Sequence, residues 1–206
     1  MNQAVLHLVE HLKRARVTPE RSPPAFPPPS RRMEFERSCE SDIFAANGWL
    51  RLELLTPSVK KAMQRALCWT ADTSWDSMRT PHIFMGLLSI GDRHVAEWCR
   101  MIGTEPDSLL MQFAALFTQQ RDNETPLVRL NREFISENAI RVLRSAYERA
   151  RRSERETIRV IDLLVAIFSS AGGIVAGCFA DVGYPPQHLA AMAVAAEERN
   201  PEPEGR

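Results

Sequence analysis

The chain has 206 residues, and its 26 Lys and Arg are balanced by 26 Asp and Glu, so the formal net charge is zero. This balance argues against a nucleic-acid binder or an interfacial membrane binder, because both classes normally carry a basic excess. With 44% hydrophobic and 25% charged residues, the composition is typical of a globular protein with a packed core.

Neither the amino terminus nor any later segment predicts export or membrane insertion. No apolar run approaches the roughly 20 residues that span a bilayer, and His7, Glu10 and His11 interrupt the apolar part of the first 15 residues. We therefore expect a cytoplasmic protein without a membrane partner. The cysteines have no CxxC spacing, so we expect buried thiols at all four positions, which are Cys39, Cys68, Cys99 and Cys178.

Residues 1–17 predict an amphipathic helix. Its apolar stripe repeats at helical spacing and consists of Ala4, Val5, Leu8, Val9 and Leu12. His7 to His11 also match HxxEH, in which two histidines on one helical face bind zinc and the glutamate activates water. A zinc hydrolase is nevertheless only a distant alternative, because the stripe leaves both histidines on the wet face and a Pro-rich spacer follows at once.

Proline placement divides the rest of the chain. Six prolines fall between residues 19 and 29, so residues 18–54 are predicted to be a Pro-rich linker followed by an irregular segment. Residues 198–206 are predicted to be a disordered tail. Thr56-Pro57 and Thr80-Pro81 instead place a capping hydroxyl before a residue with pre-set helical φ, which marks helix starts.

From residue 56 onward the apolar periodicity is helical, and no alternating run demands a sheet. The pattern predicts eight helices, near residues 56–72, 80–90, 93–102, 106–119, 136–152, 160–170, 173–181 and 185–197.

These helices form an internal repeat, because an offset of 80 residues aligns two parts of the chain without a gap. Caps fall on caps (Thr56 on Ser136), and the glycine after the third helix falls on its counterpart (Gly103 on Gly183). We therefore predict an all-α domain over residues 55–197, with two four-helix units, 55–119 and 135–197, related by a pseudo-twofold axis. A cleft between the units would be a natural partner site.

The ordered motifs of the two units resemble the double Clp repeat, the amino-terminal domain of the Clp/Hsp100 AAA+ unfoldases. The first copy shows Leu55-Thr56-Pro57, then residues 80–88 (TPHIFMGLL), Val95-Ala96 and residues 102–106 (IGTEP). The second copy shows Ile135-Ser136-Glu137, residues 160–168 (VIDLLVAIF), Val175-Ala176 and residues 182–185 (VGYP). The resemblance covers roughly residues 55–193 and does not extend to an ATPase ring.

The resemblance implies a non-catalytic domain that captures unfolded segments, degradation tags or adaptors for an ATP-driven ring. No Gly is followed by Lys, so the chain lacks a P-loop and we expect a stand-alone recognition domain without cofactor, metal or catalytic residues. Its partner would be an AAA+ unfoldase or a client or adaptor of one. An alternative is a regulator or inhibitor that occupies the unfoldase's partner surface, and the oligomeric state stays open.

Carried over by position, the family's partner site would consist of Thr56, Pro81, His82, Ser136, Leu143, Ile161 and Asp162. Some relatives receive phosphorylated arginine on an acidic residue that Pro81 and Ile161 replace here. Without that carboxylate we expect an apolar peptide or partner helix as the ligand. Helix capping by Thr56 and Ser136 and core packing by Ile161 are the plain structural alternatives.

Three further sets of residues carry weaker expectations. Residues 147–159 mix arginines with glutamates and predict a solvated helix end with local ion pairs. His82, His94 and His188 lack metal-site spacing and are expected to be hydrogen-bonded surface residues. The tryptophans are expected to be mostly buried, although an exposed Trp75 would suit a contact site.

Overall fold

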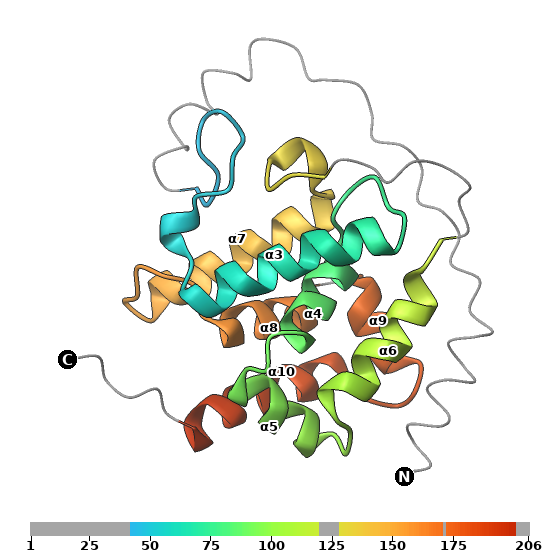
Figure 1. Ribbon diagram of the computed structural model, residues 1–206. Coiled ribbons are helices and arrows are strands. Elements are labelled where there is room, and N and C mark those ends of the chain that lie inside the picture. Colours follow the sequence, from blue (N-terminus) through green and yellow to red (C-terminus); the bar gives the residue numbers. More distant parts are fainter. Residues whose placement is uncertain (1–41, 120–127, 171, 201–206) are drawn as a thin grey trace.

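The computed structural model describes residues 42–119, 128–170 and 172–200, and these contain eight α-helices and no β-strand (Figure 1). The helices are α3 (Pro57–Asp72), α4 (Thr80–Leu88), α5 (Arg93–Met101), α6 (Pro106–Phe117), α7 (Glu137–Arg152), α8 (Val160–Ser169), α9 (Ile174–Ala180) and α10 (Pro186–Arg199). The all-α prediction is confirmed, and each predicted helix is present. The predicted helix of residues 1–17 and the Pro-rich part of the linker lie outside the described residues, and so does the tail beyond residue 200.

The helix boundaries follow the local sequence. Proline occupies the first turn of α3, α4, α6 and α10, where its missing N–H is not needed. The Asp92 side chain caps α5, and the Ser136 hydroxyl caps α7. α10 continues two residues beyond the predicted end at 197, since Arg199 pairs with Glu97 on α5.

The helices stack in layers. α3 and α7 lie side by side over α4 and α8, and α5 and α10 lie on the opposite side of α4 and α8 (Figure 1). α3 packs closely along α4, because Gly86 faces the α3 backbone: a Cβ at this position would lie 2.3 Å from the Ala62 carbonyl oxygen. The equivalent position in the second repeat, Ala166, carries that Cβ within α8.

An aromatic cluster fills the centre of the domain. The fully buried Phe84 of α4 lies 4.9 Å, ring centroid to centroid, from Phe113 on α6 and 6.0 Å from Phe168 on α8. Trp98 of α5 and Phe179 of α9 complete the cluster. Edge-to-face ring contacts of this kind stabilise a core beyond simple area burial, so both repeats depend on one shared hydrophobic core.

The two repeats also exchange backbone hydrogen bonds in a symmetric pattern. Leu55 pairs with Ile158, and Ile135 pairs with Met78. The offset of 80 residues converts the first pair into the second, because Leu55 corresponds to Ile135 and Met78 to Ile158. The predicted pseudo-twofold relation is therefore visible in individual hydrogen bonds.

The segment before α3 is irregular, as predicted, but it is packed. Ile43 and Phe44 are buried, and the Asp42 carboxylate pairs with Arg144 on α7. Residues 48–54, which we call the strap, pair antiparallel with residues 130–132: the Leu50 amide donates to the Leu130 carbonyl at 3.0 Å. Leu50 and Leu130 are themselves related by the offset of 80, so the pseudo-twofold axis passes close to this pair.

Several expectations about single residues are wrong. Cys68 is exposed on α3, although Cys99 and Cys178 are buried as expected. His82 and His94 are buried instead of lying on the surface, because their ring nitrogens bond the protein itself. Trp75 is buried and donates its indole N–H to the Phe117 carbonyl.

No single helix among the described residues is long and apolar enough to cross a membrane. α8 and α9 together pass such a test by length and composition only. They are bent by 69° at the break between them.

Candidate partner-binding site

The seven residues predicted as the partner site fall mainly at two equivalent junctions between the repeats. At the first junction, Leu54–Thr56 at the start of α3 meet Ile158–Asp162 at the start of α8. At the second junction, Phe134–Ser136 at the start of α7 meet Met78–His82 at the start of α4.

Backbone hydrogen bonds hold each junction together. At the first, the Thr56 amide donates to the Ile158 carbonyl at 3.1 Å and the Ile158 amide donates to the Leu54 carbonyl at 2.8 Å. At the second, the Ser136 amide donates to the Met78 carbonyl at 2.9 Å and the Met78 amide donates to the Phe134 carbonyl at 2.8 Å. The fold thus places two helix starts side by side, twice.

Only two of the seven side chains are accessible at the surface. Thr56 and Ser136 are half-buried, whereas the other five, Pro81, His82, Leu143, Ile161 and Asp162, are buried. Ser136 caps α7 through the Ala139 amide, while the Thr56 side chain makes no capping bond. The buried five therefore shape the junctions from within, and a partner could touch Thr56 and Ser136 directly.

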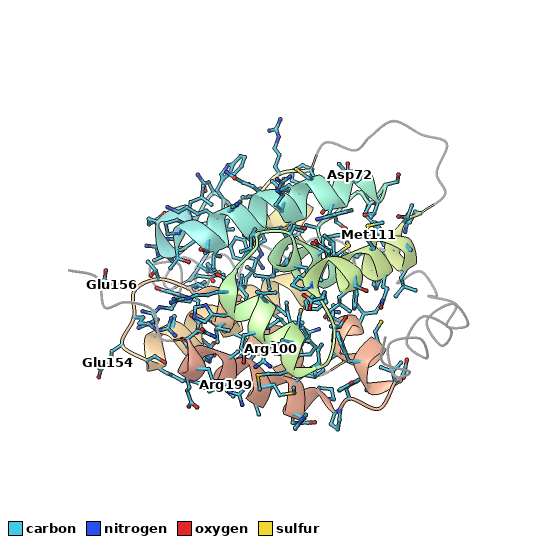
Figure 2. All side chains as sticks on the ribbon, turned by 60° about the horizontal axis from the view of Figure 1, so that its bottom comes forward. Asp72, Arg100, Met111, Glu154, Glu156 and Arg199 are labelled. Carbon is cyan, nitrogen blue, oxygen red and sulfur yellow. The ribbon has the colours of Figure 1, made fainter. Side chains whose placement is uncertain are left out.

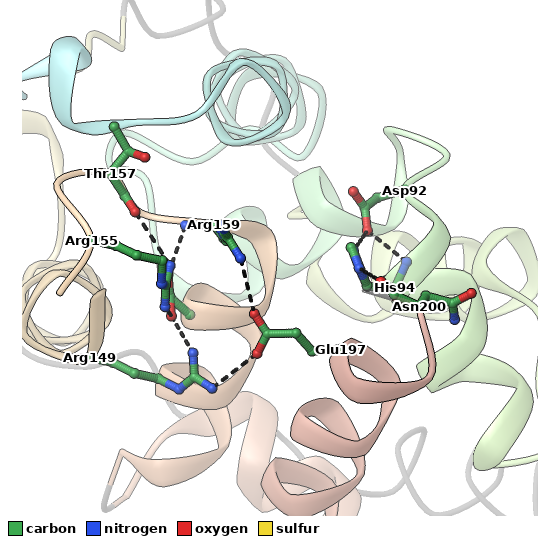
Figure 3. Close-up of polar contacts among 9 residues, drawn as sticks. Asp92, His94, Arg149, Arg155, Thr157, Arg159, Glu197 and Asn200 are labelled. Atoms are coloured by element: carbon green, nitrogen blue, oxygen red, sulfur yellow. Dashed lines mark hydrogen bonds and ion pairs between the residues drawn. The ribbon is translucent and has the colours of Figure 1, made fainter. Parts of the chain in front are cut away.

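Asp162 is the centre of an ionic cluster at the first junction. Its carboxylate is fully buried and accepts two bonds from Arg155, at 2.6 and 2.7 Å, one from the Arg149 guanidinium and one from the Arg159 amide at 2.8 Å. Glu197 of α10 pairs with Arg149 at 3.3 Å and with Arg159 at 3.8 Å (Figure 3). Part of the charged stretch predicted to be solvated is thus folded against α8, because a buried carboxylate requires charged partners.

The equivalent cluster in the first repeat is mostly aromatic. Applying the offset of 80 to Arg149, Arg155, Arg159, Asp162 and Glu197 gives Trp69, Trp75, Arg79, His82 and Phe117. The Arg79 guanidinium stacks over the Trp75 ring at 4.1 Å, and the His82 ring meets that of Trp75 edge-on at 6.0 Å.

His82 and Asp162 perform the same structural task with different chemistry. Each accepts a hydrogen bond from the backbone amide three residues earlier, Arg79 for His82 at 2.9 Å and Arg159 for Asp162 at 2.8 Å. Burial lowers the pKa of His82 to about 3, and the charge of Arg79 lowers it further. His82 is therefore a neutral acceptor, and its Nε2–H faces the Thr73 hydroxyl, which itself donates to the Trp69 carbonyl.

Two surface residues of the strap escaped the sequence analysis. Trp49 is 43% exposed and Leu52 is 44% exposed. Both lie within eight residues of Thr56, and Trp49 pairs with Asn131 in the segment that leads to Ser136. Two large apolar side chains exposed beside the junctions form a candidate contact surface. The adjacent Leu-rich sequence suggested only core residues, so periodicity alone offered no signal.

No cofactor or metal site is apparent in the described ranges. No group of three or more His, Cys, Asp or Glu side chains there could hold a metal ion. The HxxEH residues His7 and His11 lie outside the described residues.

Comparisons with solved structures place the fold. The N-terminal domain of the chaperone ClpD from Arabidopsis thaliana is 18% identical, with a TM-score of 0.53, and the match covers 70% of this chain and 98% of that one. The N-terminal domain of the ClpV1 ATPase from the E. coli EAEC Sci1 T6SS is 16% identical, with a TM-score of 0.55, and the match covers 86% of this chain and 99% of that one.

A third chain, described with a malarial protein secretion system, is 12% identical, with a TM-score of 0.55 and coverage of 72% and 97%. No curated protein matches. These similarities show a common fold only.

The sequence itself gives a more specific result. The profile described as Clp repeat (R) N-terminal domain matches residues 54–182, which include the strap's last residue, both junctions and the ionic cluster apart from Glu197. Since the match covers more than half of the chain, this protein belongs to the Clp repeat N-terminal domain family.

Proposed function

We propose that this chain is a protein-binding module of a Clp/Hsp100 system, and that it receives a polypeptide segment of an unfoldase, client or adaptor at the two junctions. The observation that carries the proposal is the position of Trp49 and Leu52: two exposed apolar side chains lie on the strap that leads into Thr56 and pairs with the segment before Ser136. Family membership supports the general role of protein binding.

The chemistry of the junctions favours an apolar guest over a phosphorylated or cationic one. Asp162 already receives bonds from Arg149 and Arg155, so its carboxylate has no capacity for a guest guanidinium. Pro81 and Ile161 supply no carboxylate in its place. An apolar peptide or an amphipathic helix would instead bury Trp49 and Leu52.

The proposed role is binding without turnover. The clustered charged groups at the first junction bond one another, and burial raises the pKa of the Cys99 thiol to about 12 and that of Cys178 to about 11, which disfavours thiolate nucleophiles. A cytoplasmic location remains a prediction of the sequence.

Affinity capture from host lysate tests the proposal, with Thr56→Asp/Ser136→Asp as the decisive variant. Aspartate is itself a good helix cap, so the variant should keep the fold while adding charge where an apolar segment is expected. Gln187→Glu, in the exposed first turn of α10, is the control for added charge.

The wild type and Gln187→Glu should enrich an AAA+ unfoldase, its protease or its clients, and the double variant should not. Equal enrichment by all three baits, or none by any, would contradict the proposal. Adding the chain to the captured ring in an ATPase assay then separates an adaptor from an inhibitor, because only an inhibitor lowers the client-stimulated rate.

A further inference from the structure

α6 carries apolar side chains on the side that faces away from the core. Leu109, Phe113 and Phe117 are buried, as expected for positions spaced by four residues. On the other side, Met111 is 66% exposed, the largest exposure of any large apolar side chain in the described ranges, and Leu110 and Ala114 are only half-buried. A helix that is apolar on more than one side is normally covered by another element.

The second repeat shows what a covered version of this helix looks like. α10, the equivalent of α6, packs along α5, α8 and α9 and presents Ala190 and Ala191 where α6 presents Leu110 and Met111. α5 is tied to α10 by the Trp98 indole, which donates to the Leu189 carbonyl at 3.1 Å, and by His94, which bonds the Asn200 carbonyl at 2.7 Å (Figure 3).

α9, the equivalent of α5, cannot cover α6 in the same way. The residues that correspond to Trp98, His94 and Glu97 are Cys178, Ile174 and Gly177, which are small or lack a polar group. α9 meets α6 through the Phe179 and Phe113 rings, 6.0 Å apart. The outer face of α6, defined here as Leu110, Met111, Ala114 and Ala115, is therefore left with apolar side chains and no helix across it among the described residues.

The charges around this face are acidic. Glu105 and Asp107 are exposed at the start of α6. Asp72 is exposed near its end, because the Gln119 amide after α6 bonds the Thr73 carbonyl at 3.0 Å. Figure 2 shows Met111 and Asp72 on the same side of the molecule. A complementary occupant would combine an apolar stripe with basic residues.

The amino-terminal segment of this chain has that composition. Ala4, Val5, Leu8, Val9 and Leu12 would form one stripe of a helix, and Lys13, Arg14 and Arg16 follow it. Residues 13–41 could span about 90 Å at the ~3.1 Å per residue of an extended Pro-rich chain, against a radius of gyration of about 15 Å for a domain of this size. Tethering also raises the segment's effective concentration at the domain to about the millimolar range.

We propose that residues 4–12 dock as an amphipathic helix on the outer face of α6, with the following basic residues beside Glu105, Asp107 and Asp72. This contact lies on α6, apart from the two junctions, and it does not depend on the proposed partner. The segment would thereby cover α6 as α5 helps to cover α10.

Hydrogen exchange of the full-length chain, read by mass spectrometry over residues 106–117, tests this docking. Leu8→Glu places a charge in the stripe and Met111→Glu places one in the receiving face. Glu10→Gln, on the side opposite the stripe, and Ala191→Glu, at the position of α10 equivalent to Met111, are the matched controls. Analytical ultracentrifugation of the same samples reports the oligomeric state.

Leu8→Glu should speed exchange in α6 by about tenfold, as expected when a docked-to-open ratio of about ten is lost. Met111→Glu should speed exchange in residues 4–12 by a similar factor, and both controls should behave as wild type. Unchanged exchange in both variants would overturn the proposal. Protection that disappears on dilution together with a dimer would also overturn it, because the segment would then bind a second copy.

Discussion

The ionic cluster offers the most decisive stability experiment, the substitution Asp162→Asn. This change keeps the size of a fully buried side chain and removes its charge. The carboxylate accepts bonds from Arg149, from both terminal nitrogens of Arg155 and from the Arg159 amide. An asparagine offers one acceptor oxygen and turns an NH₂ group toward the arginines, so two largely buried guanidinium groups lose their counter-charge.

Breaking a buried pair by removing one partner typically costs about 3–5 kcal/mol, which should lower Tm by roughly 6–20 °C in a domain of this size. Urea unfolding followed by circular dichroism at pH 7 measures the free energy directly, with Glu197→Gln as the control. Since Glu197 is a quarter exposed, its loss should cost at most about 1 kcal/mol. An Asp162→Asn variant within about 1 kcal/mol of wild type would refute the argument that this carboxylate organises the first junction.

Three further predictions concern single side chains. Gly86→Ala should destabilise the chain by about 1–3 kcal/mol, because overpacking against the Ala62 carbonyl outweighs the gain in helix propensity, whereas Ala166→Gly at the equivalent position should cost only about 1 kcal/mol; urea titrations decide between these outcomes, and a stabilised Gly86→Ala would contradict the close packing of α3 on α4. The pKa of His82 is lowered from 6.5 to about 3, so its stabilising effect is complete above pH 6.5 and is lost as the pH falls toward 3, by about 1.4 kcal/mol per pH unit; unfolding of wild type and His82→Gln between pH 4 and 7 should show a steeper acid loss in the wild type, and parallel curves would count against a buried neutral His82. Cys68 should react quickly with a thiol reagent in the folded Cys39→Ser variant, and buried Cys99 and Cys178 should not; equal labelling of the three, read by peptide mass spectrometry, would contradict the assigned burial.

The helices and their duplication could be predicted because their signals are local. Thr56-Pro57, Thr80-Pro81 and the glycines that end the third helix of each unit appear at fixed positions, and α3–α10 begin and end close to the expected residues. The offset of 80 residues then supplied the pseudo-twofold relation, which the paired hydrogen bonds of Leu55 and Ile135 display.

The interior of the candidate site could not be predicted because its contacts are distant in sequence. Glu197 reaches Arg149 across 48 residues, and Trp75 bonds the Phe117 carbonyl across 42. The mixed charges of residues 147–159 look like a solvated helix end until Asp162 is known to be buried. His82 likewise looks like a surface residue, because nothing local reveals that Thr73 and Trp75 enclose it.

The strap shows the same limitation from the opposite side. Its Leu50 and Leu54 side chains are buried, while Trp49 and Leu52 are exposed. A short irregular segment has no periodicity that would separate these two classes. The apolar surface beside the junctions therefore becomes visible only when the strap is folded against residues 130–132.

Site-specific photo-crosslinking in host cells tests most directly whether the junctions receive a polypeptide. A photoreactive phenylalanine analogue is placed at Leu52 on the strap and, as the control, at the exposed Ala191 of α10. The proposed function predicts crosslinks from position 52 to an unfoldase, adaptor or client, and their loss in the Thr56→Asp/Ser136→Asp background. Crosslinks from position 52 that are no stronger than those from position 191 would contradict it.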